Sequence, residues 1–414
     1  MRYALLATLP CLLIASPTPA AERAQSRALR PLVEKATPEA LALLERLVNI
    51  DTGTGDLEGW SKASDVVTAK LKALGMELST VPAEQAGLPD NIVARIAGSG
   101  RGRILIIAHM DTVFEPGTAA KRPYRVAGDR AYGPGVSDEK AGLVTAIAAI
   151  GVLRQAGFRD FGQITLLIDS SEEKGSIGSR QLIARLAREH EVTLSMEPGQ
   201  NPDSVVVWRK GTRIYTITVK GRAAHAGVAP QDGRNAAEEL LNQLQQLETL
   251  PRSGDGLTAN LTILQAGSRV NIIPDQAFAK LNVRARDKKD FDRVDAAVRA
   301  AAARPRIADT SITVSVENGA PPLPPNPRSD ALGAMAIATY AEIGRTLGAD
   351  GNGGASESAV AFEAGSAVLD GLGPIGDDFH SDKETLHLDT VGPRIYLLAR
   401  LLQRLGAAPG TGPN

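Results

Sequence analysis

Short apolar segments that end in polar residues alternate with helical segments along the first half of the chain. Three of them begin at Arg103, Gln163 and Val192 and are apolar at nearly every position until they end. A strand that is apolar on both faces is typical of a parallel sheet covered by helices on both sides. The segments between them have helical periodicity, at 64–75, 140–157 and 179–190. The sequence therefore predicts an α/β fold with a mostly parallel sheet and helices on both faces.

Two local features refine the N-terminal part of this fold. The segments 91–98 and 103–109 are separated by a glycine-rich turn, which favours two adjacent strands. Thr37 precedes an apolar-periodic segment at 37–50, and threonine is a common helix N-cap. We therefore expect a strand pair joined by the turn and a helix that begins at Thr37.

The pattern changes in the second half of the chain. Alternating strand segments and amphipathic helices occur there in the order β-α-β-β-α-β, at 213–221, 233–250, 257–267, 275–286, 288–303 and 310–319. This order is that of a ferredoxin-like module. The proline-rich segment 321–327 then reads as a linker, and α/β character resumes after it. The sequence thus predicts one discontinuous α/β domain, 21–211 and 321–414, interrupted by a module at 212–320.

The N-terminus has the features of a secretory signal at residues 1–20. Arg2 is followed by an apolar stretch from Ala4 to Ala15 and then by small residues. The alternative, an apolar terminus that merely frays, is disfavoured by this combination. We expect cleavage after Ala20 and export to the periplasm or out of the cell. The single cysteine, Cys11, lies in this leader, so disulfide and thiol chemistry are excluded from the mature chain.

Composition excludes two classes of partner. The formal net charge is −1, so neither a basic surface for nucleic acid nor a polybasic membrane segment is present. An apolar content of 43% with 22% charged residues fits a soluble globular chain with a sizeable core. We expect no nucleic acid partner and no membrane association once the leader is removed.

Residues that can bind metal follow several of the apolar segments. They are His109, Asp111, Asp138, Glu172, Glu173 and Glu197, with His380 further downstream. The carboxyl ends of parallel strands meet at one crevice, where such side chains can gather. Imidazole and carboxylate ligands without thiolates suit a catalytic zinc site, and two dications sharing a carboxylate would relieve the repulsion among the acids. Each cluster alone also fits a hydrogen-bonded loop histidine or a solvated turn, but their joint occurrence favours a metal centre.

These residues stand in motifs that occur together in one known family. The motifs are "HMDTV", "YGPGVSDEKAG", "SEEKGSIGS", "EP", "GRAAHAG", "VNIIP" and "FHSDKE", in this order. Together they resemble the aminoacylase/carboxypeptidase G family of di-zinc exopeptidases over residues 40 to 405, and most closely its glutamate carboxypeptidase branch. The resemblance implies a zinc-exopeptidase-like sheet domain and a module that serves as a lid and dimerisation domain.

The resemblance also implies a ligand set for two zinc ions per chain, with Co²⁺ or Mn²⁺ as possible substitutes. Asp138 would bridge both ions. His109 and Glu197 would complete one site, and Glu173 and His380 would complete the other.

Two further roles come from the same resemblance. Glu172 would act as the general base, and Asp111 would hydrogen-bond the second nitrogen of His109. The peptide bond between Asp138 and Glu139 is expected to be cis. Adjacent residues in an extended chain point in opposite directions, so Glu172 and its neighbour can both face the metals only if the backbone turns there. Gly175 would permit such a turn.

Three module residues match family positions that contact substrate. His225 matches a histidine that crosses a dimer interface and polarises the scissile carbonyl. Asn271 matches a second lid residue, and Arg284 matches an arginine that binds the terminal carboxylate. The resemblance therefore implies a homodimer. The alternatives from the residues alone are a turn-capping histidine, an asparagine that holds its loop and a surface arginine.

The chain departs from the family pattern at a few positions. The strand 204–208 is apolar where the glutamate branch has polar substrate contacts, and Glu357 stands where relatives often have aspartate. Two other histidines are expected to lie outside the site: His387 as a structural residue and His190 at a solvated helix end.

The favoured function is a secreted di-zinc metallopeptidase that cleaves a C-terminal amino acid from a peptide or an N-acyl amino acid. An aminopeptidase or dipeptidase with the same ligands is an alternative. A periplasmic binding protein that holds an anion through one metal would not need Glu172, and a non-catalytic dimerising scaffold would not need the complete ligand set.

Overall fold

The computed structural model describes residues 19–407 of the 414-residue chain. All but the last two residues of the predicted leader, residues 1–20, lie outside the described residues. Cys11 lies outside them as well. No helix among the described residues is both long enough and apolar enough to span a membrane.

A six-stranded sheet forms the centre of the larger domain. Its order is β1-β2-β6-β3-β7-β17. Strands β6, β3, β7 and β17 are parallel, whereas β1 and β2 pair antiparallel at one edge. The strands are β1 (Glu77–Val81), β2 (Asn91–Ala97), β3 (Arg103–His109), β6 (Gln163–Asp169), β7 (Val192–Ser195) and β17 (Ala367–Leu369). The predicted mostly parallel sheet is confirmed.

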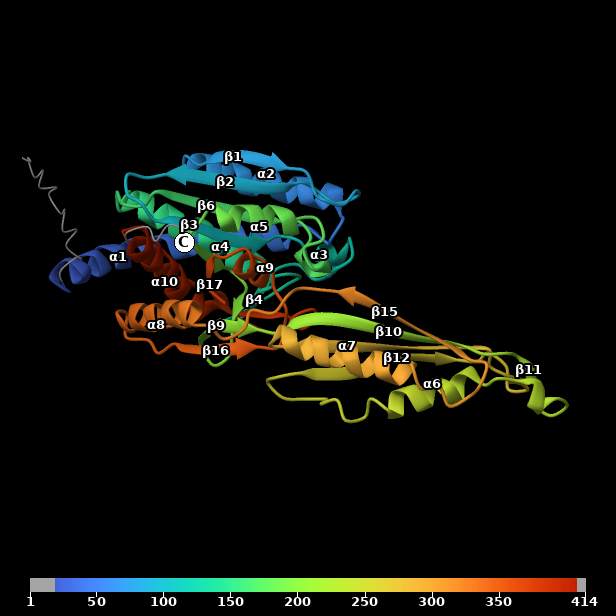
Figure 1. The fold of residues 1–414 in the computed structure, drawn as a ribbon. Helices are drawn as coiled ribbons and strands as arrows, with labels where there is room; N and C mark the ends of the chain where they lie inside the picture. The colour runs from blue at the N-terminus through green and yellow to red at the C-terminus, as the bar shows by residue number, and fades with distance from the viewer. Residues whose placement is uncertain (1–18, 408–414) are drawn as a thin grey trace, which may run out of the picture.

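Strand β3 shows why its sequence is continuously apolar. Ile104, Ile106 and Ala108 belong to a core on one face, and Leu105 and Ile107 belong to a second core on the other. The first core is covered by α1 (Pro19–Val48), α2 (Leu57–Ala73), α4 (Lys140–Gln155), α8 (Pro327–Ala341) and α10 (Leu388–Gly406). The second is covered by α5 (Arg180–Arg188) and α9 (Ser358–Glu363), so helices lie on both faces of the sheet (Figure 1).

Smaller sheets and turns surround the carboxyl end of the main sheet. A five-stranded sheet has the order β4-β5-β19-β18-β8, and a two-stranded parallel sheet pairs β16 with β9. The strands of these two sheets are β4 (Arg125–Ala127), β5 (Arg130–Tyr132), β8 (Pro198–Gly199), β9 (Ser204–Arg209), β16 (Gly348–Asn352), β18 (Gly373–Asp377) and β19 (Thr385–His387). Two short helices complete this part of the domain, α3 (Thr118–Lys121) and η1 (Glu172–Lys174).

The predicted adjacency of 91–98 and 103–109 is wrong. Strand β6 lies between β2 and β3, antiparallel to β2 and parallel to β3. The glycine-rich segment does not close a hairpin, because its amides bond to the loop that leads into β6. Gly98 N donates to Gly162 O at 3.1 Å and Gly100 N donates to Phe161 O at 2.9 Å.

The predicted helix start at Thr37 is also wrong. Helix α1 begins at Pro19, and the Thr37 hydroxyl donates to the Val33 carbonyl, one turn earlier, at 2.8 Å. The buried stripe of the helix continues upstream through Leu29 and Val33. Packing of that stripe against the core carries the helix through Pro38, because tertiary contacts override local propensity.

The inserted module has the predicted β-α-β-β-α-β order. Its four-stranded antiparallel sheet has the order β12-β14-β10-β15. The elements are β10 (Gly211–Lys220), β11 (Ala224–His225), η2 (Pro230–Asp232), α6 (Ala236–Gln245), β12 (Thr258–Ala266), β13 (Ile272–Ile273), β14 (Gln276–Ala285), α7 (Lys288–Ala302) and β15 (Ser311–Asn318).

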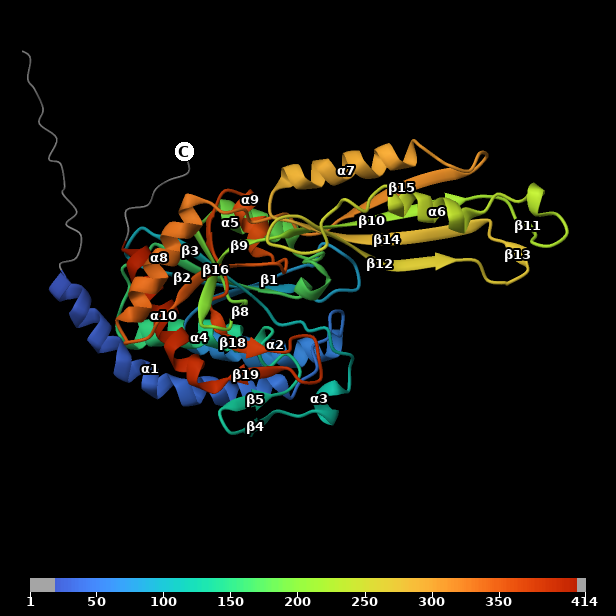
Figure 2. The same cartoon turned by 90° about the horizontal axis from the view of Figure 1, so that it is seen from below.

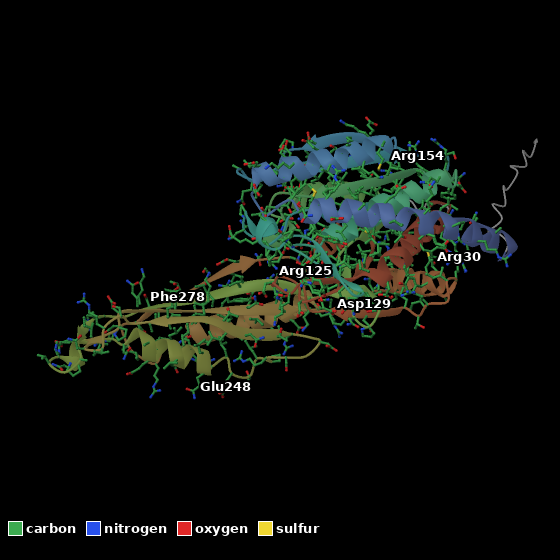
Figure 3. All side chains as sticks on the ribbon, turned by 180° about the vertical axis from the view of Figure 1, so that it is seen from behind. Arg30, Arg125, Asp129, Arg154, Glu248 and Phe278 are labelled. Carbon is green, nitrogen blue, oxygen red and sulfur yellow. The ribbon has the colours of Figure 1, made fainter. Side chains whose placement is uncertain are left out.

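The module has a core of its own on one face of its sheet. Tyr215, Ile217 and Val219 of β10 pack there with Phe291 and Val294 of α7. The intervening β10 residues, such as those at 214 and 216, lie on the opposite, open face. The module extends away from the sheet domain and ends in the small two-stranded sheet of β11 and β13 (Figures 1 and 2). Side chains along it project into solvent (Figure 3).

Candidate metal centre

Five predicted ligands meet at the carboxyl edge of the parallel sheet. His109 is the last residue of β3, Asp138 precedes α4, and Glu173 lies in η1 after β6. Glu197 follows β7, and His380 follows β18. His109 and His380, which are 271 positions apart in the chain, thus both approach Asp138. This arrangement is the crevice at strand ends that an α/β sheet favours.

Asp138 stands between the two histidines. Its Oδ1 lies 3.2 Å from His109 Nε2, and its Oδ2 lies 3.1 Å from His380 Nε2. His380 Nε2 is also 3.1 Å from Glu173 Oε2, and His109 Nε2 is 3.9 Å from Glu197 Oε1. Each oxygen of Asp138 therefore faces a separate imidazole–carboxylate pair, which is the geometry required of a bridging ligand.

The charges in this cluster perturb one another. Burial alone would lower the pKa of His109, but hydrogen bonding to Asp111 and Asp138 outweighs it and raises that pKa well above its usual value. Hydrogen bonds to Asp138 and Glu173 raise the pKa of His380 to about 10. Burial would raise the pKa of Asp138, but the two histidines lower it overall. The carboxylate of Asp138 is therefore strongly favoured, as a bridging ligand requires.

Both glutamates after β6 face the crevice because the chain turns there. Glu172 and Glu173 lie in the short 3-10 helix η1, which Gly175 ends with a φ of 78°. The predicted turn at Gly175 is present. The backbone amides of both glutamates donate to the carboxylate of Asp111, at 3.0 and 3.2 Å. Asp111 thus fixes the position of this turn.

Asp111 also contacts His109, as expected. His109 Nδ1 lies 3.1 Å from the backbone oxygen and 3.4 Å from Oδ1 of Asp111. Nε2 is thereby left to face Asp138. Fixing one ring nitrogen so that the other can ligate is a common arrangement around metal-binding histidines.

Burial sets the acid–base character of Glu172. Burial, together with the nearby carboxylates of Glu197 and Glu357, raises the pKa of Glu172 well above its usual value. A carboxylate with a raised pKa holds a proton more readily near neutral pH, which suits a group that must accept and release one.

The loop that carries Asp138 is held by a residue that sequence reasoning missed. Glu384 accepts hydrogen bonds from the amides of Gly135, Ser137 and Asp138, at 2.9, 2.9 and 3.0 Å. The expected cis peptide between Asp138 and Glu139 is present. Glu384 lies in the same "FHSDKE" motif as His380, which was its only signal in the sequence.

Three other buried residues at the site were also missed as participants. Glu139 accepts the His109 amide at 3.0 Å, and its Oε2 lies 3.5 Å from His109 Nε2. Both carboxylate oxygens of Glu357 lack a hydrogen-bond partner among the described residues, although the side chain is 1% exposed. Arg209 lies 3.6 Å from Glu197. Burial, which no local pattern revealed, distinguishes these side chains from solvated ones.

The cluster fits a pair of metal ions. The ligand atoms of His109, Glu139 and Glu197 lie within 4.8 Å of one another, as do those of Asp138, Glu173 and His380. Two imidazoles among several buried carboxylates, one of them with unpartnered oxygens, form a donor set whose mutual repulsion bound cations would relieve. The residues present therefore suit two dications bridged by Asp138.

Two of the three predicted substrate residues of the module lie apart from this crevice. His225 and Asn271 are exposed at the two-stranded β11–β13 sheet, where Ala226 N donates to Asn271 O at 3.0 Å. That small sheet is at the far end of the module (Figure 2). Arg284 lies at the near end, partly buried, with its Nε donating to Asn282 Oδ1 at 3.1 Å. The structure thus does not bring His225 or Asn271 to the crevice of their own chain.

The two remaining histidines differ from one another. His190 is buried, and its nitrogens lie 2.8 Å from Thr165 Oγ1 and 2.7 Å from Leu186 O, so its predicted solvated position is wrong. The helix end packs against β6, which the sequence did not indicate. His387 pairs with Asp377 at 2.5 Å, and lies outside the ligand cluster.

Comparison with known proteins decides the family. The sequence model of peptidase family M20/M25/M40 matches residues 105–404 of the chain. The chain belongs to this family. It is 37% identical over 373 residues to carboxypeptidase G2 of Pseudomonas sp. (strain RS-16), an alignment that covers 89% of this chain and 90% of that protein.

More distant similarities extend to a desuccinylase and to a solved metallo-carboxypeptidase. A succinyl-diaminopimelate desuccinylase of Gluconobacter oxydans is 27% identical, with 81% of this chain and 90% of that one covered. The crystal structure of an M20 family metallo-carboxypeptidase from Sulfolobus solfataricus superposes with a TM-score of 0.71 at 16% identity, covering 89% of this chain and 100% of that one. The M20 fold is therefore shared along nearly the whole chain, and the protein is a metal-dependent peptidase or amidohydrolase.

Proposed function

We propose that this M20 enzyme is an exported, homodimeric di-zinc carboxypeptidase. It would release an amino acid with a free α-carboxylate from a peptide or from an N-acyl amino acid, in the periplasm or outside the cell. The leader pattern at residues 1–20 supports export. The observation that carries the catalytic part is the position of Asp138 between His109 and His380, with Glu172 beside them.

The site supports hydrolysis of an amide by water. Two metal ions held by the five ligands would polarise the scissile carbonyl and lower the pKa of a bound water molecule. Glu172 would accept a proton from the attacking water and deliver it to the leaving amine. Asp111 would keep Glu172 in place through its hydrogen bond to the Glu172 amide.

A cationic cluster beside the crevice supports recognition of a carboxylate. Arg284 and Arg286 lie two residues apart at the end of β14 and so share one face, and Lys210 precedes the paired strand β10 at the same level. Burial lowers the pKa of Lys210; among the nearby charges, that of Asp255 raises this pKa, and those of Arg286 and Arg284 lower it. Lys210 Nζ donates to Gly254 O, and the Arg286 guanidinium lies over the Trp208 ring.

This cluster favours a carboxypeptidase over an aminopeptidase. Three cations beside one nearby carboxylate, that of Asp255, leave net positive charge for an anionic group, and arginine suits a planar carboxylate in particular. An aminopeptidase must instead recognise an ammonium group. A cavity of about 290 Å³ is lined by Glu172 of the crevice and by Thr212 of β10. Thr212 pairs directly with Arg284. A substrate there would reach both the general base and the cations.

The specificity is tested with matched substrates. N-acetyl dipeptides with a free or an amidated C-terminus are compared, and wild-type enzyme should prefer the free acid. Arg284→Met and Lys210→Met should each reduce kcat/KM for the free acid by about 10-fold or more, because a charge-assisted hydrogen bond contributes roughly 1.5–3 kcal/mol. Lys220→Met, at the exposed far end of the same strand, is the control. Equal cleavage of free and amidated substrates would refute a carboxypeptidase.

The catalytic part is tested at the two adjacent glutamates. Glu172→Gln should lower kcat by about 10²- to 10⁴-fold while two metal ions remain bound and KM changes little. Glu173→Gln should instead lose metal from one site. A Glu172→Gln variant with wild-type kcat, or with metal loss like that of Glu173→Gln, would reverse the assignment of base and ligand.

The module supports a homodimer. Strand β12 is an edge strand with Leu261, Ile263 and Leu264 all more than 40% exposed. The His225 ring is also oriented for use outside its own chain. The amides of Gly227 and Val228 donate to its Nδ1 at 3.2 Å each, which leaves the proton on the exposed Nε2. A hydrogen-bond donor that points into solvent could polarise the carbonyl of a substrate bound to a partner subunit.

A further inference from the structure

Arg209 ends strand β9 at the position where the chain leaves the sheet domain for the module. Its side chain is buried, with 4% exposure. The guanidinium holds Asp370 by two hydrogen bonds, from Nε to Oδ2 at 2.6 Å and from Nη2 to Oδ1 at 3.0 Å. Such a bidentate pair fixes the plane of the guanidinium as well as its position.

The same guanidinium faces Glu197. The Nη2 atom lies 3.6 Å from Glu197 Oε2, whereas Glu197 Oε1 lies on the side of His109 Nε2. The two oxygens of this glutamate thus have different surroundings. One is directed to the metal centre and the other to a fixed cation.

We propose that Arg209 is a positioning residue for the metal ligand Glu197, holding Oε2 so that Oε1 alone is presented to the site shared with His109 and Asp138. This inference rests on the proposed role of Glu197 as a ligand. Partners of this kind orient a ligating carboxylate, and their loss commonly weakens metal affinity by about 10- to 100-fold.

The support for Arg209 continues behind Asp370. Ser358 Oγ donates to Asp370 Oδ2 at 2.5 Å, and the Gly371 amide donates to Oδ1. Asp370 therefore keeps its orientation whether or not a metal is present. Lysine could not replace Arg209 fully, because one ammonium cannot make two parallel bonds to Asp370 and also face Glu197.

The backbone of Arg209 is hydrogen-bonded to the segment through which the chain returns from the module. Arg209 N donates to Leu323 O at 2.8 Å, and Leu323 N donates to Arg209 O at 3.1 Å. Leu323 belongs to the segment that returns from the module. The guanidinium therefore projects from a point where both crossings between the domains are hydrogen-bonded to each other.

The test measures metal binding to metal-free full-length protein, titrated with Zn²⁺ against a competing chelator. Wild type should bind two ions. Arg209→Met should weaken one of the two by about 10- to 100-fold and leave the other, held by Asp138, Glu173 and His380, unchanged. Arg209→Lys should be intermediate. Unfolding of the metal-free proteins is measured in parallel.

Arg394→Met is the matched control. Arg394 is a fully buried arginine that pairs with Asp203 at 2.6 Å, and it does not contact a predicted ligand. It also donates to the backbone oxygens of Gly371 and Ser204. Its loss should lower stability because these hydrogen bonds and the ion pair with Asp203 are removed, but should not change either zinc affinity.

Arg209→Met leaves the Asp370 carboxylate without its arginine partner and can fold poorly for that reason. The double variant Arg209→Met/Asp370→Asn removes this negative charge. It should fold better than Arg209→Met and still show one weakened zinc site.

Two results would overturn the proposal. In one, Arg209→Met binds two zinc ions with wild-type affinity. In the other, Arg394→Met weakens zinc binding as much as Arg209→Met does, so that the effect is only a loss of stability. A wild-type chain that binds no zinc would instead refute the proposed function, which separates the two failures.

Discussion

The two sheets of this enzyme are built on opposite plans. In the sheet domain, β3 and β6 bury both faces, so nearly every side chain between their ends packs in one of the two cores. In the module, β10 buries Tyr215, Ile217 and Val219 on one face and leaves the residues between them on an open face. A doubly covered sheet can place chemistry only at its strand ends, and that is where His109 and Glu173 lie. A singly covered sheet can place it on its open face, where Arg284 lies.

This difference assigns different work to the two parts. The strand ends provide predicted ligands that converge from five points in the chain, of which His380 is the exposed one. The open face provides the half-buried Arg284, and the β11–β13 strand pair provides the exposed His225, both of which can approach a substrate from outside. The comparison predicts that changes in the sheet domain act on metal binding, whereas changes in the module act on substrate and assembly.

The largest expected effect is at the residue on which the metal centre depends most. Asp138→Ala removes the ligand that faces both His109 and His380, so both metal ions should be lost. We expect kcat to fall by at least about 10³-fold, because a bound metal contributes several kcal/mol of charge stabilisation. Elemental analysis after dialysis should show fewer than one ion per chain. Retention of one full equivalent would mean that Asp138 does not bridge.

The next largest effect tests whether His225 of the module acts at the active site of the other subunit. His225→Ala and Glu172→Gln should each be nearly inactive alone, with kcat lowered by about 10²-fold or more. Mixing them by unfolding and refolding together should restore about a quarter of wild-type activity, because half of the dimers are mixed and each has one complete site.

The control for that mixture uses one variant refolded alone. His225→Ala refolded without its partner should stay inactive. If the mixture is no more active than its components, then His225 acts within its own chain or does not act at all.

A smaller effect compares the two sheets directly. Ile106→Thr and Ile107→Thr, on opposite faces of β3, should each lower the free energy of unfolding by roughly 1.5–3 kcal/mol, because both side chains are fully buried. In β10 only one of two matched changes should do so. Ile217→Thr should cost a similar amount, and Ile214→Thr should cost less, because the Ile214 side chain is only half-buried on the opposite face. Equal costs in β10 would show that its open face is covered.

The same difference explains what the sequence could predict. Continuously apolar strands and alternating strands are visible as patterns, so the parallel sheet and the module were both predictable. The convergence of the five predicted ligands was predictable because they follow apolar segments or stand in family motifs. Glu139, Glu357 and Arg209 were not, because adjacent charged residues in a sequence look alike whether they are solvated or buried. The order of β2, β6 and β3 was missed because strand adjacency depends on pairing with a segment some 60 residues away.

The smallest effect concerns one tyrosine in each part of the molecule. Burial, with a hydrogen bond to Asp295, raises the pKa of Tyr215 in the module to about 12. Burial, with a hydrogen bond to Glu342, raises the pKa of Tyr396 in the sheet domain to about 12 as well. An unfolded tyrosine has a pKa of about 10. Below pH 10 both states keep the proton, so neither group makes stability depend on pH.

Between pH 10 and 12 the unfolded tyrosine loses its proton while the folded one keeps it, so stability falls as pH rises. Tyr215→Phe and Tyr396→Phe should each make that fall less steep, as measured by urea unfolding at pH 8, 10 and 11. Which unfolding transition each substitution changes shows how the two parts are coupled. If each part unfolds separately, Tyr215→Phe changes only the transition of the module and Tyr396→Phe changes only that of the sheet domain. If both changes act on one shared transition, then the hydrogen-bonded crossings at Arg209 and Leu323 join the two cores into a single cooperative unit, and the division of work between the sheets does not extend to their folding.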